Sequence, residues 1–115
     1  MIKEESIVPV VVIDVRTERE LKADGKLPGS HNIPIAKIAD AFELSSNDFF
    51  KKFGFEKPSK NHKNVVFTCQ IGGRAKFARK LLQKQGYNHL RVYEGSFVDW
   101  TKNNGPLCSI GEKNC

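Results

Sequence analysis

The chain has 115 residues, of which 39% are hydrophobic and 28% are charged. This length accommodates one domain around one hydrophobic core, and the composition is ordinary for a globular protein. No apolar run approaches the roughly 18 residues that a membrane span needs, and the first residues lack the pattern of a signal peptide. We therefore expect a single domain over residues 1–115 that contacts no membrane and acts as a monomer.

The formal net charge is +6, and part of it is concentrated just before the apolar run that leads to Cys69. The clustered lysines are Lys51, Lys52, Lys57, Lys60 and Lys63. A basic cluster can bind nucleic acid, but this one lacks the interleaved aromatic residues on which bases stack. We interpret it as a solvated connection that also biases the electric field toward small anions. No nucleic-acid partner is expected.

Three cysteines stand at scattered positions: Cys69, Cys108 and Cys115. An odd, scattered set argues against a disulfide framework and for a reducing compartment. We expect the cytoplasm, and leave a mitochondrial location open although the acidic pair Glu4 and Glu5 is atypical of a transit peptide. Cys108 and Cys115 are interpreted as incidental exposed cysteines, with a role as resolving thiols as the alternative.

The first half of the chain alternates apolar runs with capping and turn signals. Residues 7–15 form an apolar run with β-branched residues at 10–13 in unbroken succession, which predicts a strand buried on both faces. Thr17 and Glu20 form a capping-box pattern that starts a helix over 18–23, before Gly25. Residues 27–34 predict a turn and a short strand. Two helical pieces follow over 34–53, and then a polar connection over 54–64.

The second half continues the alternation of strand and helix. Residues 65–68 predict a buried strand, and a helix over 74–85 is expected to bury Phe77 among other apolar residues before it stops at Gly86. Residues 90–93 predict a strand, and a last helix follows in which Trp100 anchors the core. The ordered core is expected over about 8–104, with a loosely ordered tail over 105–115. Strands separated by helices predict an α/β fold, with a central parallel sheet flanked by helices on both faces.

The residues from Val65 to Arg74 carry the chemistry that the sequence predicts. An apolar strand ends at Cys69, two glycines follow, and a helix starts at once. The start of a helix presents unpaired N–H groups and about half a positive charge, which favour the thiolate form of a cysteine. Glycines let backbone amides turn inward and form an anion-binding nest. We therefore predict that Cys69 is a nucleophile in an anion-binding cradle, and the alternative is an inert core thiol.

With these residues, the chain resembles the single-domain rhodaneses, which are sulfurtransferases related to thiosulfate sulfurtransferase. Their active loop is a cysteine, four residues and often an arginine, and here Cys69 and Arg74 bracket four residues. Three more stretches match family patterns in the right order: VIDVR at 12–16, LPGSHNIP at 27–34, and YEGS at 93–96 with Trp100 beyond it. The likeness covers about residues 10–104.

The resemblance implies a double displacement without metal or organic cofactor. Cys69 would take the outer sulfur of thiosulfate or of a low-molecular-weight persulfide, and the resulting persulfide would pass it to a thiophilic acceptor such as cyanide or glutathione. Gln70, Ile71, Gly72, Gly73 and Arg74 would bind the anionic donor. No basic residue lies between the cysteine and Arg74, which departs from members that favour thiosulfate and makes a glutathione persulfide a fair alternative donor.

Other functions remain as alternatives at this point. Phosphatases and arsenate reductases related in fold have five residues between cysteine and arginine, whereas this loop has four and contains no acidic residue. Non-catalytic rhodanese-like binding modules typically lack the cysteine. A persulfide carrier that passes sulfur to a protein would keep it.

Three polar residues near the predicted loop have both a functional and a structural interpretation. Asp14 and Arg16 end the first strand, and the resemblance favours a structural role in tying loops together. His31 could be a base for Cys69, but in the family pattern its position belongs to a structural turn.

Overall fold

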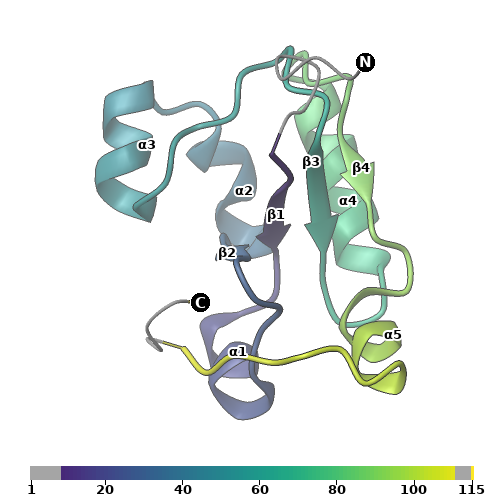
Figure 1. The fold of residues 1–115 in the computed structure, drawn as a ribbon. Helices are drawn as coiled ribbons and strands as arrows, with labels where there is room; N and C mark the ends of the chain where they lie inside the picture. The colour runs from purple at the N-terminus through teal and green to yellow at the C-terminus, as the bar shows by residue number, and fades with distance from the viewer. Residues whose placement is uncertain (1–8, 111–114) are drawn as a thin grey trace, which may run out of the picture.

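The computed structural model describes residues 9–110 and residue 115. Within them, a parallel sheet contains β2 (His31–Asn32), β1 (Val11–Asp14), β3 (Val65–Thr68) and β4 (Arg91–Val92), in that spatial order. The helices are α1 (Glu18–Asp24), α2 (Ile35–Ala41), α3 (Ser46–Phe53), α4 (Gly73–Gln83) and α5 (Ser96–Lys102). The alternation of strands and helices confirms the predicted α/β class (Figure 1).

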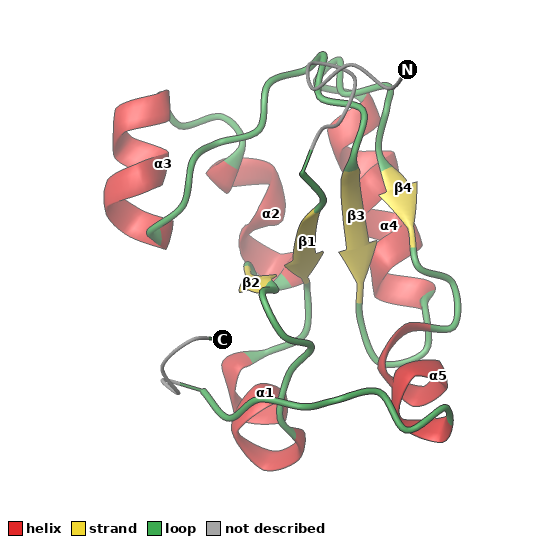
Figure 2. Ribbon diagram, viewed as in Figure 1, coloured by secondary structure: helices red, strands yellow, loops and turns green. Residues whose placement is uncertain are grey.

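The two central strands are held in register along their whole length. Val11 of β1 pairs with Val65 of β3, and Asp14 pairs with Thr68. The side chains that β1 and β3 bury, with those of α2 and α4, form one core that includes Ile13, Phe67 and Ile38. Figure 2 shows the arrows of β1, β3 and β4 pointing toward the end of the sheet at which α1 and α5 lie. Because ligands of parallel sheets bind at the carboxyl ends of strands, this end is the one to examine for a site.

Local sequence signals set the bounds of most helices. Thr17 and Glu20 form the predicted capping box at the start of α1, and Ser45 caps α3 by accepting the N–H of Asp48. Gly54 ends α3 in the left-handed conformation. Within the described residues, no helix has the length and apolar character that a membrane crossing would require.

The prediction that Phe77 is buried is wrong, since its side chain is 54% exposed. The residues that α4 buries are Ala75, Ala78 and Leu82, which recur at helical spacing on one side of the helix. Phe77 lies two positions from Ala75, which places it on the opposite side. Trp100, predicted to anchor the core, is partly exposed and packs against the chain after α5, where its Nε1–H donates to the Pro106 carbonyl at 2.7 Å.

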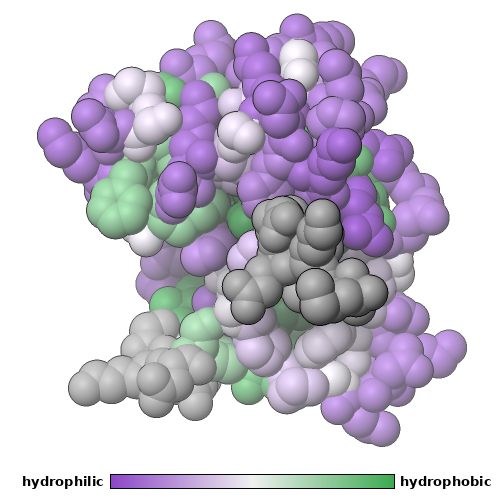
Figure 3. Space-filling model, turned by 45° about the horizontal axis from the view of Figure 1, so that its top comes forward, coloured by the Kyte–Doolittle hydropathy of each residue, from purple (hydrophilic) through white to green (hydrophobic). Residues whose placement is uncertain are grey.

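The predicted polar connection over 54–64 enters β3 at Val65, and therefore lies at the opposite end of this strand from Cys69. Lys60 and Lys63 are exposed there, while Lys57 donates from Nζ to the Leu44 carbonyl at 2.7 Å. Figure 3, in which this end comes forward, shows a mostly hydrophilic surface over it. These lysines are thus remote from the carboxyl ends of the strands.

Candidate active site

Cys69 follows directly on β3 and is 1% exposed, and its sulfur faces backbone N–H groups from the start of α4. The Gly72 N–H donates to Sγ at 3.0 Å, and the Ala75 N–H points to it at 3.4 Å. These are donors that the first turn of a helix leaves without an intrahelical partner. Hydrogen bonds from such donors are strongest to an ionised acceptor. The loop therefore directs two hydrogen-bond donors at the sulfur of Cys69.

Gly72 gives the loop its shape. Its φ is +104°, and a Cβ placed on it would come within 2.4 Å of the Glu94 carbonyl oxygen. Both facts demand glycine, because other residues are strained at positive φ and have no room here. A Cβ on Gly73 would meet nothing within 4 Å. The two adjacent glycines therefore differ. The loop requires glycine at position 72, whereas a side chain at position 73 would meet no steric obstacle.

A second segment, between β4 and α5, holds the loop from the other side. The Ser96 Oγ accepts the Cys69 N–H at 3.1 Å and donates to the Tyr93 carbonyl at 2.8 Å. The same oxygen lies 3.9 Å from the cysteine sulfur. Next to it, the Phe97 and Val98 N–H groups donate to the carbonyls of Cys69 and Gln70 at 2.9 and 3.0 Å. The chain after β4 thus fixes the first two residues of the loop.

Asp14 and Arg16 form a buried ion pair beneath the loop. Both side chains are 0% exposed, and the Arg16 Nη2 donates to Asp14 Oδ2 at 2.8 Å and to the Gly25 carbonyl at 3.0 Å. The guanidinium lies 4.1 Å from the centre of the Phe97 ring and donates weakly to Gln70 Oε1 at 3.4 Å. These contacts agree with the predicted structural role, since Arg16 joins the end of β1, the turn at Gly25 and the loop.

Arg74 closes the loop and is engaged by a carboxylate of α1. Its Nη1 and Nη2 donate to the two carboxylate oxygens of Glu20 at 2.6 and 2.8 Å, a bidentate pair. The hydrogen bond from Arg74 is the largest cause that lowers the pKa of Glu20 to about 2. The same bond raises the pKa of Arg74. Arg74 is the charged residue among those predicted to bind the sulfur donor, and its charge is therefore already paired within the protein.

With this geometry in view, comparison with known proteins decides the family. Residues 1–103 match the family model described as a rhodanese-like domain. The chain belongs to the rhodanese family. The rhodanese domain-containing protein CG4456 of Drosophila melanogaster is 38% identical over 96 residues, which cover 84% of this chain and 86% of the fly protein. The Homo sapiens thiosulfate:glutathione sulfurtransferase is 35% identical over 89 residues, covering 77% and 76%.

A solved structure agrees with this assignment. The human single-domain sulfurtransferase TSTD1 superposes with a TM-score of 0.77 at 32% identity, over 81% of each chain. Two longer relatives, in Schizosaccharomyces pombe and Saccharomyces cerevisiae, are named as mitochondrial, the first as a putative thiosulfate sulfurtransferase, and this chain covers 63% and 62% of their lengths. The expected rhodanese fold and membership of this sulfurtransferase family are thus confirmed.

The structure brings most of the predicted site residues of this rhodanese domain together. Gln70, Ile71 and Gly72 lie in the turn between β3 and α4, Gly73 is the first residue of α4, and the Ile71 side chain is 74% exposed. Sequence reasoning does not assign Ser96 or Glu20 to the site. The signal for Ser96 is the YEGS stretch, which the resemblance matches as a motif. Glu20 is visible only as a capping residue.

His31 is placed in β2, at the edge of the sheet, and its ring stacks on Phe55 with the two ring centres 3.9 Å apart. Cys69 follows β3, with β1 between these strands. Burial is the largest cause that lowers the pKa of His31, and the nearby Lys26 lowers it further. Stacking and burial account for His31 without a catalytic role, as the family pattern leads us to expect.

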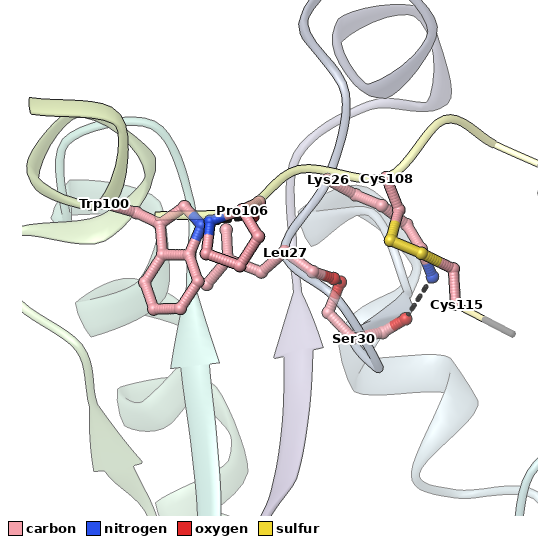
Figure 4. The surroundings of a disulfide bond; sticks show 7 residues. All are labelled: Lys26, Leu27, Ser30, Trp100, Pro106, Cys108 and Cys115. Carbon is pink, nitrogen blue, oxygen red and sulfur yellow. Dashed lines mark hydrogen bonds between the residues drawn. A yellow bond between two sulfur atoms is a disulfide. The ribbon is translucent and has the colours of Figure 1, made fainter. Parts of the chain in front are cut away.

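The expectation of no disulfide, and of exposed Cys108 and Cys115, is wrong. The structure joins these two cysteines, and Cys108 is buried. Lys26 and Cys108 exchange two backbone hydrogen bonds of 2.9 Å, and the Gly29 N–H donates to the Cys115 carbonyl at 2.7 Å. Figure 4 shows the disulfide beside Lys26, whose Nζ donates to the Ser30 carbonyl at 2.7 Å. Both cysteines are thus held on the turn after α1, with their Cα atoms 6.1 Å apart, a normal disulfide spacing.

The disulfide also bears on the order of the C-terminal segment and on the cellular compartment. The segment over 105–115, expected to be a loosely ordered tail, is anchored at Cys108, although residues 111–114 lie outside the described part of the chain. The cysteine count no longer argues for a reducing compartment, because two of the three cysteines are paired.

Proposed function

We propose that this rhodanese domain transfers sulfane sulfur from thiosulfate or a low-molecular-weight persulfide to a thiol acceptor, through a persulfide on Cys69. The observation that supports this most is the cysteine sulfur at the end of β3, with the N–H groups of Gly72 and Ala75 directed at it. An inert core thiol needs no such donors. The name of the human relative, a thiosulfate:glutathione sulfurtransferase, supports the same donor and acceptor classes.

The proposed reaction has two displacements. The Cys69 thiolate attacks the outer sulfur of thiosulfate, a new S–S bond forms to the cysteine, and sulfite leaves with the electrons of the broken bond. An acceptor thiolate or cyanide then attacks the outer sulfur of the persulfide and restores the thiolate. The amides of Gly72 and Ala75 would stabilise the Cys69 thiolate, and N–H groups of the loop would stabilise the negative charge that the persulfide carries on its outer sulfur. Ser96 and Arg16 would hold the loop in the shape that this requires.

The decisive experiment is the intact mass of the purified protein after brief exposure to thiosulfate or to glutathione persulfide. We expect a species one sulfur atom heavier, which cyanide removes while thiocyanate appears. Cys69→Ser should form none of it. The double variant Cys108→Ser/Cys115→Ser is the matched control and should still form it. Failure of both donors on the wild type, or an adduct that persists in Cys69→Ser, would overturn the proposal.

The next acceptor of the outer sulfur of the Cys69 persulfide distinguishes an enzyme that uses small thiols from a persulfide carrier. Release to glutathione, measured as loss of the heavier species, supports the thiol-acceptor assignment. A persulfide that glutathione and cyanide leave in place would instead indicate a carrier that serves a protein. A chain that binds partners but never forms the persulfide would be a binding module.

We also propose that the protein acts as a monomer in the cytoplasm, with mitochondria as the alternative because two relatives are named as mitochondrial. Light scattering after size exclusion measures the mass in solution, and a dimer would contradict the first statement. Cell fractionation with an antibody tests the second.

A further inference from the structure

The basic side chains that belong to the loop or lie beneath it are all engaged by carboxylates, among the residues that the structure describes. Arg16 is paired with Asp14 in the interior, and Arg74 is paired with Glu20. On the first turn of α4, Lys76 lies 3.2 Å from a Glu94 oxygen. The lysines of the polar connection lie at the other end of β3. The groups that contact the Cys69 sulfur as hydrogen-bond donors are backbone N–H groups, whereas the nearby cations are each countered by a carboxylate.

Glu20 is held where it binds Arg74 by its own helix. Its Oε1 accepts the Thr17 N–H at 3.0 Å and the Thr17 Oγ1–H at 3.2 Å, while the same carboxylate binds the guanidinium. The capping box thus fixes the carboxylate before any donor arrives. Arg74 keeps N–H donors outside this pair, but the Glu20 carboxylate already counters the positive charge that they would offer to an anionic donor.

The surface beside the loop is apolar as well as weakly charged. Ile71, in the middle of the loop, is 74% exposed. Val98 is also exposed, and it lies near the loop because its N–H donates to the carbonyl of Gln70, the residue before Ile71. An inorganic dianion gains nothing from such side chains, whereas the carbon skeleton of an organic donor can bury them.

We propose that Glu20 is a specificity-determining residue, which neutralises Arg74 and thereby shifts preference from dianionic thiosulfate toward singly charged organic sulfur donors. The inference rests on the proposed function and adds the donor class to it. Glu20 touches no reacting atom in this scheme. It acts through Arg74, by setting how much positive charge the end of the loop offers to an anion.

Two donors with the same leaving chemistry test the role of charge. Thiosulfate carries two negative charges, and methanethiosulfonate carries one with a methyl group in place of an oxygen. Cys69 would take the terminal sulfur from either, with sulfite leaving from the first and methanesulfinate from the second. The measured quantity is the ratio of kcat/KM for thiosulfate to kcat/KM for methanethiosulfonate, with cyanide as acceptor.

In Glu20→Gln the amide can keep the capping hydrogen bond, and the charge of Arg74 is released. We expect the ratio to rise about threefold to tenfold at low salt, mainly through a lower KM for thiosulfate, and the gain to shrink as salt screens it. The double variant Glu20→Gln/Arg74→Gln should return the ratio to that of the wild type. Glu18→Gln, which removes a charge from the same helix but only the exposed pair with Lys22, should leave the ratio unchanged.

A loss of folding or of loop order would lower both rates together and leave the ratio constant, so the ratio isolates the effect of charge. An unchanged ratio in Glu20→Gln would overturn the inference, and so would a gain that persists in the double variant. If the wild type takes sulfur from neither donor, the proposed function itself fails. If it takes sulfur from both and only the ratio is insensitive to Glu20, the proposed function stands and this inference falls.

Discussion

The N–H of Gly72 donates to the sulfur of Cys69 at 3.0 Å, and only a glycine can hold it there. The positive φ turns this amide toward the sulfur, and the Glu94 carbonyl occupies the space that a side chain would need. The same residue therefore supplies a donor to the Cys69 sulfur and the bend that lets α4 begin beside it. This relationship and two others lead to predictions about stability and activity.

Gly72→Ala should disturb the loop, and Gly73→Ala should not. A methyl group on Gly72 meets backbone at 2.4 Å, so either the loop or the segment at Glu94 must move. We expect a loss of roughly 1–3 kcal/mol in unfolding free energy for the strained backbone. Persulfide formation should slow by about tenfold or more as the donor to the sulfur is displaced. Urea denaturation and intact mass give the two readings, and equal behaviour of the two variants would contradict this account of the loop.

Asp14→Asn should be far more destabilising than the loss of an exposed ion pair. Asp14 and Arg16 are fully buried, so the variant leaves a buried guanidinium without its counter-charge. We expect a loss of about 3–5 kcal/mol. Glu18→Gln removes the exposed pair with Lys22 and should cost about 0.5 kcal/mol or less. Both values come from urea unfolding at neutral pH, and similar costs for the two variants would contradict the structural role given to Arg16.

His31 should affect stability in acid but not catalysis. Burial lowers its pKa in the folded state from 6.5, so the unfolded chain binds a proton more readily as pH falls. The stability advantage of the neutral ring is thus complete above about pH 6.5 and is lost as pH falls through that value. The difference in unfolding free energy between the wild type and His31→Gln should narrow over this range.

His31 should have no effect on the pH profile of sulfur transfer. His31 lies in the edge strand β2, and its ring stacks on Phe55. The pH profile of kcat/KM should therefore keep its shape in His31→Gln. Loss of one limb of that profile would revive the role as a base for Cys69. Stability curves that stay parallel down to about pH 5 would contradict the pKa direction.

Much of the site is encoded locally in the sequence. The apolar run that ends at Cys69, the glycines after it and the helical pattern from Arg74 are contiguous, and strand, loop and helix start follow from them by propensity and capping alone. The capping box of Thr17 and Glu20 is local in the same sense, and so is the alternation of strands and helices that predicts the α/β class. Local signals of this kind depend on neighbours along the chain, which the sequence displays directly.

The partners of these residues were decided only by the tertiary structure. Glu20 and Arg74 are 54 positions apart, as are Arg16 and Gln70, and Ser96 is 27 positions from Cys69. The periodicity of the sequence cannot predict such pairs. They form because the crossovers of the parallel sheet bring the carboxyl ends of β1, β3 and β4 together at one end of the sheet. The pairing of Cys108 with Cys115 depends likewise on the turn at Lys26, on which their segment lies. Local sequence therefore predicts Cys69 as the nucleophile, whereas packing determines which charged side chains near it are already paired.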